Sequence, residues 1–300
     1  MGLIEKLEAA KEKKSQKKLR IVVVKAANEE VLGSIKRAVD NDLVEAILID
    51  EKEAIEEQCE DLSIDLKNIK IIDEKEDQKA AAKGVELVRN QEADALMKGF
   101  IGTSDLLRAV VNKEKGIRAS KLLSHVAVID LPALDRLVAV TDGGMVVRPD
   151  KEELKTIIEH GVEVMQSIQE EEPKVALLSA SENVMKASDA SVWAKELTEE
   201  HSGDDYLLEG PISLDLSLDP EIAKGKNYPG KIQGDADIIV TPDIVSGNSL
   251  SKSLLMFADA KMAGLILGAK VPIILTSRTS SSDEKYASIL LAQQLMQEKK

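Results

Sequence analysis

A strand-like apolar run, VPIIL at Val271–Leu275, leads directly into a cluster of polar side chains. Ser277 and Arg278 come first, and Asp283 and Glu284 follow a few residues later. The arginine guanidinium is a rigid planar fork suited to bidentate contacts with phosphate or carboxylate. Ser277 could donate a hydrogen bond to a developing oxyanion, and either carboxylate could accept a proton. The simpler alternative is a surface arginine beside a helix that a neighbouring serine or aspartate caps.

A second loop of this kind follows the strand pattern that ends at Met97. Gly99 and Gly102 would let the backbone approach a ligand closely, and cationic residues lie on both sides of them. The helix that follows would supply free N–H groups and a partial positive charge at its first turn. A flexible turn with solvated charges is the competing interpretation. The candidate phosphate ligands are Lys98, Thr103, Ser104 and Arg108.

Two loops in the second half of the chain also stand between a strand and a helix. The hydroxyls of Ser179 and Ser181 suit a helix cap, which is the simpler explanation for them. In the other loop, a Ser-Gly-Asn run precedes a helix that we expect from Ser249, and it could form an anion-binding nest. A lysine one turn later strengthens this interpretation, although Asn248 could be only a cap. The candidate substrate ligands are Ser179, Ser181, Ser246, Gly247, Asn248 and Lys252.

The composition excludes several classes of partner. The 300 residues carry a formal charge of −14, which repels nucleic acids and anionic membrane surfaces. Aromatic residues make up only 2% of the chain, too few for base-stacking platforms. Lys270 and Pro272 break the longest apolar run, so we expect no membrane-spanning segment and no signal peptide. The single cysteine, Cys59, allows no intramolecular disulfide and suits a cytoplasmic location.

Apolar β-branched runs alternate with helical patterns along the chain, which predicts an α/β fold with parallel strands covered by helices. Two runs, 124–133 and 135–144, are expected to be adjacent strands, with an antiparallel arrangement as one possibility. The last strand is expected over 269–278, before a closing helix. Ligands of open α/β sheets gather at the carboxyl ends of strands, which is where the four candidate loops lie.

The chain is expected to pass between two α/β lobes along GGMVVRP, at 143–149, and again along VPIILTSR, at 271–278. The first lobe would then contain residues 1–140 and 277–300, and the second would contain residues 141–276. No metal site is predicted, because the three histidines lack the spacing of metal ligands. These histidines are His125, His160 and His201.

Taken together, the loops resemble the phosphate acetyl/butyryltransferase family, and they look more similar to its butyryltransferases. The resemblance is carried by TPDIVSGN at 241–248 and by TSR at 276–278, which a serine-rich turn follows. The runs AGLILGAKVPI, LEGPISLDLS, VALLSAS and ADALMKGFIGTSDLLRAVV also match the family. The similarity extends from about Leu19 to about Leu291.

This resemblance implies two α/β/α lobes of the isocitrate/isopropylmalate dehydrogenase type, with a cleft between them, in a homodimer or higher homo-oligomer. It implies that a short acyl-CoA, butyryl favoured, reacts with inorganic phosphate to give acyl phosphate and CoA, with no acyl-enzyme, metal or other cofactor. The family's Ser-Arg pair maps onto Ser277 and Arg278, and its first-lobe arginine maps onto Arg108. Its catalytic aspartate falls on Glu284, with Asp283 beside it, so the base stays open between these two.

Other functions stay open. The first is a phosphate acetyltransferase that uses acetyl-CoA. The second is a metal-dependent decarboxylating dehydrogenase on the same scaffold. That enzyme would need clustered aspartates and a tyrosine-lysine pair, and Tyr206, Tyr228 and Tyr286 do not stand in such a motif. The third is a non-catalytic sensor of CoA or acyl phosphate.

Overall fold

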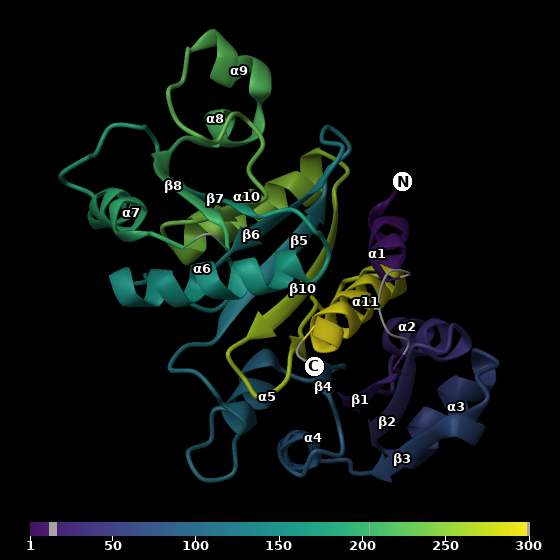
Figure 1. Ribbon diagram of the computed structural model, residues 1–300. Helices are drawn as coiled ribbons and strands as arrows, with labels where there is room; N and C mark the ends of the chain where they lie inside the picture. Colours follow the sequence, from purple (N-terminus) through teal and green to yellow (C-terminus); the bar gives the residue numbers. More distant parts are fainter. Residues whose placement is uncertain (12–16, 204, 299–300) are drawn as a thin grey trace. The chain divides into compact units, whose positions relative to one another are not determined.

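The computed structural model describes residues 1–11, 17–203 and 205–298, and it divides into two compact units (Figure 1). Unit 1 consists of Met1–Leu123 and Ala263–Lys300, and unit 2 consists of Ser124–Met262. The expected boundaries lay after residues 140 and 276 instead. The difference arises because each antiparallel strand pair stays together: the pair within 124–141 in unit 2 and the pair within 261–274 mainly in unit 1.

Unit 1 contains a largely parallel sheet. Its strands are β1 (Leu19–Val24), β2 (Val44–Asp50), β3 (Ile69–Asp73), β4 (Ala95–Lys98), β10 (Lys261–Leu267) and β11 (Ile273–Ile274). The order is β3-β2-β1-β4-β11-β10, and neighbours run parallel except for β10 and β11. We did not expect β10; it folds back onto β11 through a turn that holds Gly268 at φ +92°. β11 starts only after Pro272, which has no N–H to donate to a neighbouring strand.

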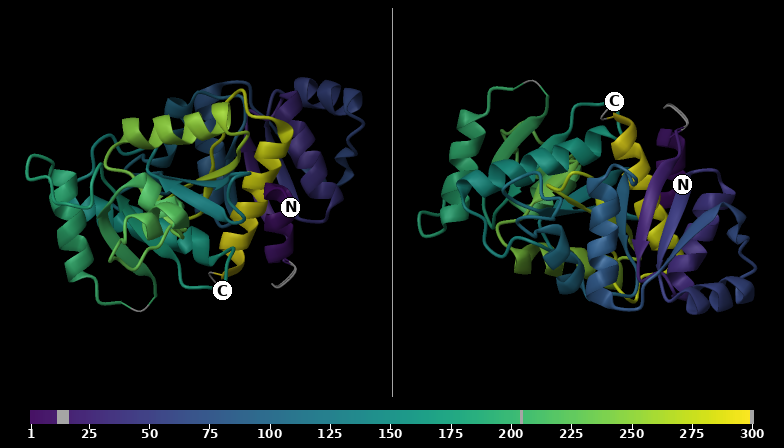
Figure 2. Two further views of the ribbon diagram at one scale, coloured as in Figure 1. Left: turned by 90° about the horizontal axis from the view of Figure 1, so that it is seen from above. Right: turned by 90° about the horizontal axis from the view of Figure 1, so that it is seen from below.

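Helices cover both faces of this sheet. They are α1 (Leu3–Lys11), α2 (Glu29–Asp40), α3 (Lys52–Asp61), α4 (Asp77–Arg89), α5 (Thr103–Val110) and α11 (Ser282–Glu298), with a 3₁₀ turn at Leu66–Asn68. α11 packs against α1, α2 and β11, whereas α4 packs against β1, β2 and β4 and contacts α5 (Figure 2). Asn28 caps α2 as its sequence predicts, with Oδ1 accepting the Val31 N–H at 3.2 Å.

The strands of unit 2 also have helices on both faces (Figure 1). These strands are β5 (Ser124–Asp130), β6 (Leu137–Thr141), β7 (Lys174–Leu178), β8 (Leu207–Ile212) and β9 (Ile238–Val240), in the order β5-β6-β9-β7-β8. β5 and β6 are antiparallel, as one reading of the sequence allowed, and the other neighbours are parallel. The helices are α6 (Lys151–Gln166), α7 (Asp189–Glu200), α8 (Leu214–Leu218), α9 (Pro220–Gly225) and α10 (Ile244–Phe257).

The segment expected as a strand over 143–149 is a turn instead. The Asp142 carboxylate stabilises this turn by accepting the backbone N–H groups of Gly144 at 2.6 Å, Met145 at 2.8 Å and Val146 at 3.2 Å. A backbone whose N–H groups converge on one carboxylate cannot extend along a sheet. The turn leads into α6, which begins with a capping box between Asp150 and Glu153.

Candidate active site

The loop that carries Arg278 and the loop that carries Lys98 leave the sheet of unit 1 side by side. β11 runs parallel to β4, and Ile274 lies opposite Met97 in the register. Parallel neighbours end at the same edge of a sheet, so Lys98 stands beside the residues that lead into the Ser-Arg pair. The guanidinium carbon of Arg278 lies 5.3 Å from the centre of the Phe100 ring, within cation–π range. Two loops that the sequence indicated independently therefore meet at Arg278.

Gly99 fixes the path of the Lys98 loop. Its N–H donates to the Val24 carbonyl at 2.8 Å, and the Phe100 N–H donates to the Lys25 carbonyl at 2.7 Å. A Cβ atom at position 99 would lie 2.0 Å from the Lys25 carbonyl oxygen. Any side chain would therefore push the loop away from β1, which explains the glycine.

Lys98 is a buried cation. Its side chain ends β4, the residue is 3% exposed, and its Nζ donates to the Gly99 carbonyl at 3.2 Å. Burial, and then the positive charges of Arg278 and Lys285, lower the pKa of Lys98 to about 8. A lysine held in this way gains from any anion that reaches it.

Lys285 is a second buried cation, and the sequence analysis missed it. It lies in the first turn of α11 and is 3% exposed, and its Nζ donates to the carbonyl oxygens of Ser280 at 2.5 Å and Ser277 at 3.4 Å. Burial lowers its pKa, although the charges of Glu30 and Glu284 oppose that shift. The signal in the sequence was a lysine in the first turn of a helix, where the helix dipole disfavours positive charge.

A neighbouring lysine shows what an ordinary structural cation looks like in this unit. Lys25 follows β1, and its amine forms an ion pair with Asp50 and lies 3.7 Å from Asp77. Within the part of the chain that the structure describes, neither Lys98 nor Lys285 forms such a pair with a carboxylate. Lys98 therefore lacks the counter-ion that Lys25 has, whereas the charges of Glu30 and Glu284 act on Lys285 without forming an ion pair with it.

The Ser277 hydroxyl faces its neighbour in the loop. A hydrogen bond of 3.0 Å joins it to the Thr279 hydroxyl, and Ser277 Oγ also accepts the Thr279 N–H at 3.3 Å. When Thr279 donates both bonds, the Ser277 hydrogen is available to an outside acceptor. Both residues are exposed. Ser277 can thus act as a donor to an oxyanion without breaking the loop.

The two candidate bases already have partners. Asp283, whose side chain is 73% exposed, forms an ion pair of 2.8 Å with Arg37 on α2. Glu284 forms a capping box with Ser281: its carboxylate accepts the Ser281 N–H at 3.2 Å, and its own N–H donates to Ser281 Oγ at 3.3 Å. Glu30 accepts the Ser282 N–H at 2.5 Å, which adds a carboxylate at the same helix end. The assignment of the base to Asp283 or Glu284 stays a prediction.

The remaining phosphate candidates lie on α5. Gly102 is the N-cap of this helix, in place of the expected Thr103 or Ser104, and it makes no side-chain cap bond. Thr103 and Ser104 are exposed in the first turn. Arg108 pairs with Asp105 on its own helix at 3.2 Å, and its side chain is 67% exposed. Among the residues that the structure describes, Arg108 forms no hydrogen bond or ion pair with the loop that carries Arg278.

The Ser-Gly-Asn run of unit 2 does not form the expected nest before a helix. α10 starts at Ile244, earlier than expected, because Asp243 Oδ1 accepts the N–H groups of Val245 and Ser246, each at 2.9 Å. The Ser246 hydroxyl donates to Asp243 Oδ2 at 3.1 Å. Asn248 Nδ2 donates to the Gly143 carbonyl at 3.0 Å. These side chains thus join α10 to its own start and to the turn after β6.

The other candidates of unit 2 fall into two kinds. Ser181 Oγ accepts the Asn183 N–H at 3.1 Å, a local turn contact. The Ser179 hydroxyl is buried and has no hydrogen-bond partner among the described residues. Lys252 is exposed on α10. Their assignment to CoA stays a prediction.

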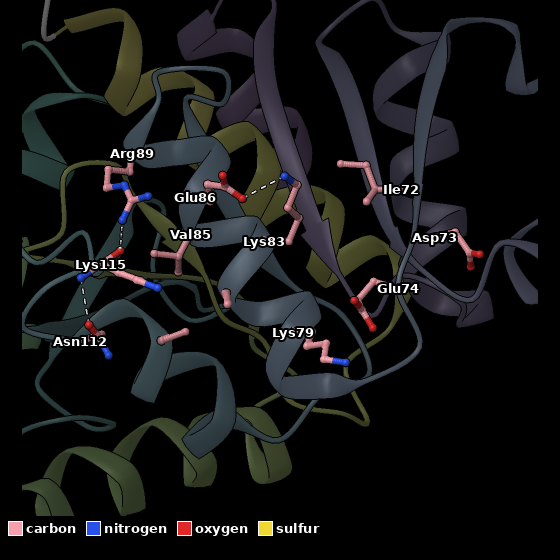
Figure 3. A pocket seen from close by; sticks show the side chains of 12 residues that line it. Ile72, Asp73, Glu74, Lys79, Lys83, Val85, Glu86, Arg89, Asn112 and Lys115 are labelled. Atoms are coloured by element: carbon pink, nitrogen blue, oxygen red, sulfur yellow. Dashed lines mark hydrogen bonds and ion pairs between the residues drawn. The ribbon is translucent and has the colours of Figure 1, made fainter.

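A cavity of about 580 Å³ lies elsewhere in unit 1, beside α4 (Figure 3). Two of its basic side chains are engaged with their neighbours: Lys83 pairs with Glu86 at 2.9 Å, and Arg89 donates to the Lys115 carbonyl at 3.3 Å. None of the candidate residues lines this cavity.

The described residues contain no cluster of three or more His, Cys, Asp or Glu side chains placed to hold a metal ion. In the same residues, no helix has the length and apolar character that crossing a membrane requires.

Comparison with known proteins identifies the family. The family described as phosphate acetyl/butaryl transferase matches residues 77–293. The chain belongs to this family. Its relatives include a "Probable phosphate butyryltransferase" of Bacillus subtilis (strain 168), 37% identical over 275 residues that cover 91% of each chain. A phosphate acetyltransferase of Rickettsia typhi is 35% identical, over 92% of this chain and 80% of that protein.

A solved structure extends the comparison to three dimensions. The crystal structure of a branched-chain phosphotransacylase from Enterococcus faecalis V583 matches with a TM-score of 0.83 and 34% identity, over 93% of this chain and 99% of that one. The predicted resemblance, the α/β fold class and the prediction of a phosphate acyltransferase are therefore confirmed.

Gly247 offers a test of why the Ser-Gly-Asn run has this sequence. A Cβ atom there would lie 2.5 Å from the Asp142 carbonyl and 2.6 Å from Thr241 Oγ1. We expect Gly247→Ala to lower the free energy of unfolding by roughly 1–3 kcal/mol through overpacking, despite the better helix propensity of alanine. Gly225→Ala is the matched control, since nothing lies within 4 Å of its Cβ position. Urea unfolding compares the two variants, and a Gly247→Ala protein at least as stable as Gly225→Ala would contradict this packing role.

Proposed function

We propose that the protein transfers a short acyl group, butyryl or one of similar length, between CoA and inorganic phosphate. The observation that carries this proposal is the arrangement of buried and exposed cations at the edge of β4 and β11, in a chain of this family. Lys98 and Arg278 provide positive charge on adjacent loops, and the buried amine of Lys98 has no carboxylate partner among the described residues. Inorganic phosphate is the anionic substrate that such a site would bind.

The reaction would begin when a phosphate oxygen attacks the thioester carbonyl carbon of acyl-CoA. The new C–O bond gives a tetrahedral intermediate with a negative oxygen, which the Ser277 hydroxyl can stabilise by a hydrogen bond. One such donor is typically worth about 3 kcal/mol. Collapse of the intermediate breaks the C–S bond and releases acyl phosphate, and the CoA thiolate takes up the proton that the attacking hydrogen phosphate gives up. In the reverse direction a carboxylate, Asp283 or Glu284, would accept that proton.

Direct attack is favoured over a covalent acyl-enzyme by the nucleophiles available. Cys59 is 1% exposed, and burial raises the pKa of its thiol, so this cysteine is poorly suited to act as a thiolate nucleophile. The hydroxyl of Ser277 contacts Thr279 and has no basic side chain among its described partners. Holding two substrates in line can supply roughly 7–11 kcal/mol of the barrier, and it needs no covalent step.

The choice of acyl chain is tested with a panel of thioesters. Purified protein is incubated with phosphate and with acetyl-, propionyl-, butyryl- or isobutyryl-CoA, and the released thiol is titrated against a heat-treated control. We expect the highest kcat/KM with butyryl-CoA or isobutyryl-CoA. Higher kcat/KM with acetyl-CoA would make the protein a phosphate acetyltransferase, and no thiol release with any substrate would overturn the proposed function.

Arg278 is tested by the variant Arg278→Gln. Losing the guanidinium removes a fixed charge from the phosphate, so we expect a higher KM for phosphate and a fall in kcat/KM of about 10²–10³-fold. The control is Arg89→Gln, which removes an arginine of the same unit from the end of α4. Initial rates at varied phosphate measure both variants, and unchanged kinetics in Arg278→Gln would remove this residue from the site.

A further inference from the structure

The cations of the candidate site have an unusual shortage of negative partners. Lys98 and Lys285 are each 3% exposed, and the charges that act on Lys98 are those of Arg278 and Lys285, both positive. The Lys98 ammonium has three N–H donors, and among the described residues it uses one, toward the Gly99 carbonyl. Two donors are left for a ligand, in surroundings of low dielectric where an unpaired charge is costly.

The negative groups of the neighbouring elements are committed elsewhere. On β1, Asp50 pairs with Lys25. On α2 and α11, the carboxylates of Glu30 and Glu284 each accept a backbone N–H at the start of α11. The charged groups around the site are Lys25, Asp50 and Asp77 near β1, Asp105 and Arg108 on α5, Glu30 on α2, and Arg278, Glu284 and Lys285 near α11.

Lys285 connects the loop to the buried amine. Its Nζ donates to the carbonyls of Ser277 and Ser280, on both sides of Arg278 and Thr279, so it anchors the loop that presents the guanidinium. Its charge also acts on Lys98. Lys285 is therefore placed to position one phosphate ligand and to influence the protonation of another.

We propose that phosphate binding at this site is coupled to uptake of a proton by Lys98. Lys285 is a positioning residue that holds the Arg278 loop and influences the protonation of Lys98. The proton comes from solvent, and the only covalent change is the N–H bond that forms on the Lys98 amine. The inference rests on the proposed function and adds which side chains change state when the substrate binds.

The sign of the effect follows from the charges. With its pKa lowered to about 8, Lys98 is largely neutral at pH 9 in the free protein and largely protonated at pH 7. A dianion beside the amine stabilises the ammonium and raises its pKa, so phosphate binding causes proton uptake between pH 7 and pH 9. Phosphate itself is already dianionic above pH 8, so this proton belongs to the protein.

Calorimetry measures the coupling directly. Inorganic phosphate is titrated into the full chain at pH 8.5 in two buffers of very different ionisation enthalpy, and the difference in heat gives the protons taken up. We expect about 0.8 proton per phosphate for a group with a pKa of about 8 that becomes fully protonated on binding. Lys79→Met, which removes an exposed lysine of α4, should give the same value. Lys98→Met should take up none and bind phosphate at least tenfold more weakly.

Kinetics supply a second readout that does not depend on a variant. The KM for phosphate of the unaltered protein should rise above pH 8, approaching tenfold per pH unit, because only the protonated site binds well. Lys98→Arg, which stays charged, should show no such rise.

The variant Lys285→Gln separates an effect on the protonation of Lys98 from a simple loss of stability. Removing a positive neighbour favours the Lys98 ammonium, so the pH at which KM begins to rise should move upward, while KM at pH 7 increases because the Arg278 loop is less well held. A variant that was merely less stable would not move this inflection. An inflection that stayed in place would overturn the role given to Lys285.

The outcomes distinguish the two proposals. If thiol release is normal, three results would each overturn the coupling and leave the acyltransferase activity standing. They are no proton uptake at pH 8.5, no measurable phosphate binding, and proton uptake that persists in Lys98→Met. Absence of thiol release from the unaltered protein would instead overturn the proposed function.

Discussion

The candidate site depends on buried positive charge that forms no ion pair with a carboxylate among the described residues. Lys98 at the end of β4 and Lys285 at the start of α11 are both nearly inaccessible, and the charge of Lys285 opposes that of Lys98. Such an arrangement is costly in the free protein, since desolvation and like charges act together. It becomes favourable when an anion enters. In a protein with a formal charge of −14, this local reversal of charge supports the proposal that phosphate binds here despite the overall field.

Backbone geometry makes the arrangement possible. Gly99 lies so close to the Lys25 carbonyl that no side chain fits, which holds the Lys98 loop against β1. Parallel pairing of β4 with β11 places the next loop alongside it, and Phe100 stacks near the Arg278 guanidinium. The carboxylates of Glu284 and Glu30 accept backbone N–H groups at the start of α11; their charges act on Lys285, and the charges that act on Lys98 are positive. The same backbone contacts that build the fold therefore position the charged groups of the candidate site.

The sequence predicted what local patterns determine. Alternating strands and helices predicted the α/β class, and Ser277, Arg278 and Lys98 were proposed as site residues because each lies at or just after the end of a strand pattern. Other features depend on contacts between distant segments. The Asn248 side chain donates to the Gly143 carbonyl, over a hundred residues away in the chain, whereas the early start of α10 follows from a local cap by Asp243. The sequence analysis did not select Lys285 because its burial is produced by tertiary packing of α11, which periodicity alone does not reveal.

The most direct measurement is a crystal structure of the protein soaked with inorganic phosphate at pH 7.5. Charge-assisted hydrogen bonds should place phosphate oxygens about 2.7–2.9 Å from the Lys98 amine and from the Arg278 guanidinium at the same time. Phosphate bound at another position, with Lys98 still directed only at the Gly99 carbonyl, would contradict the view that these cations form the substrate site.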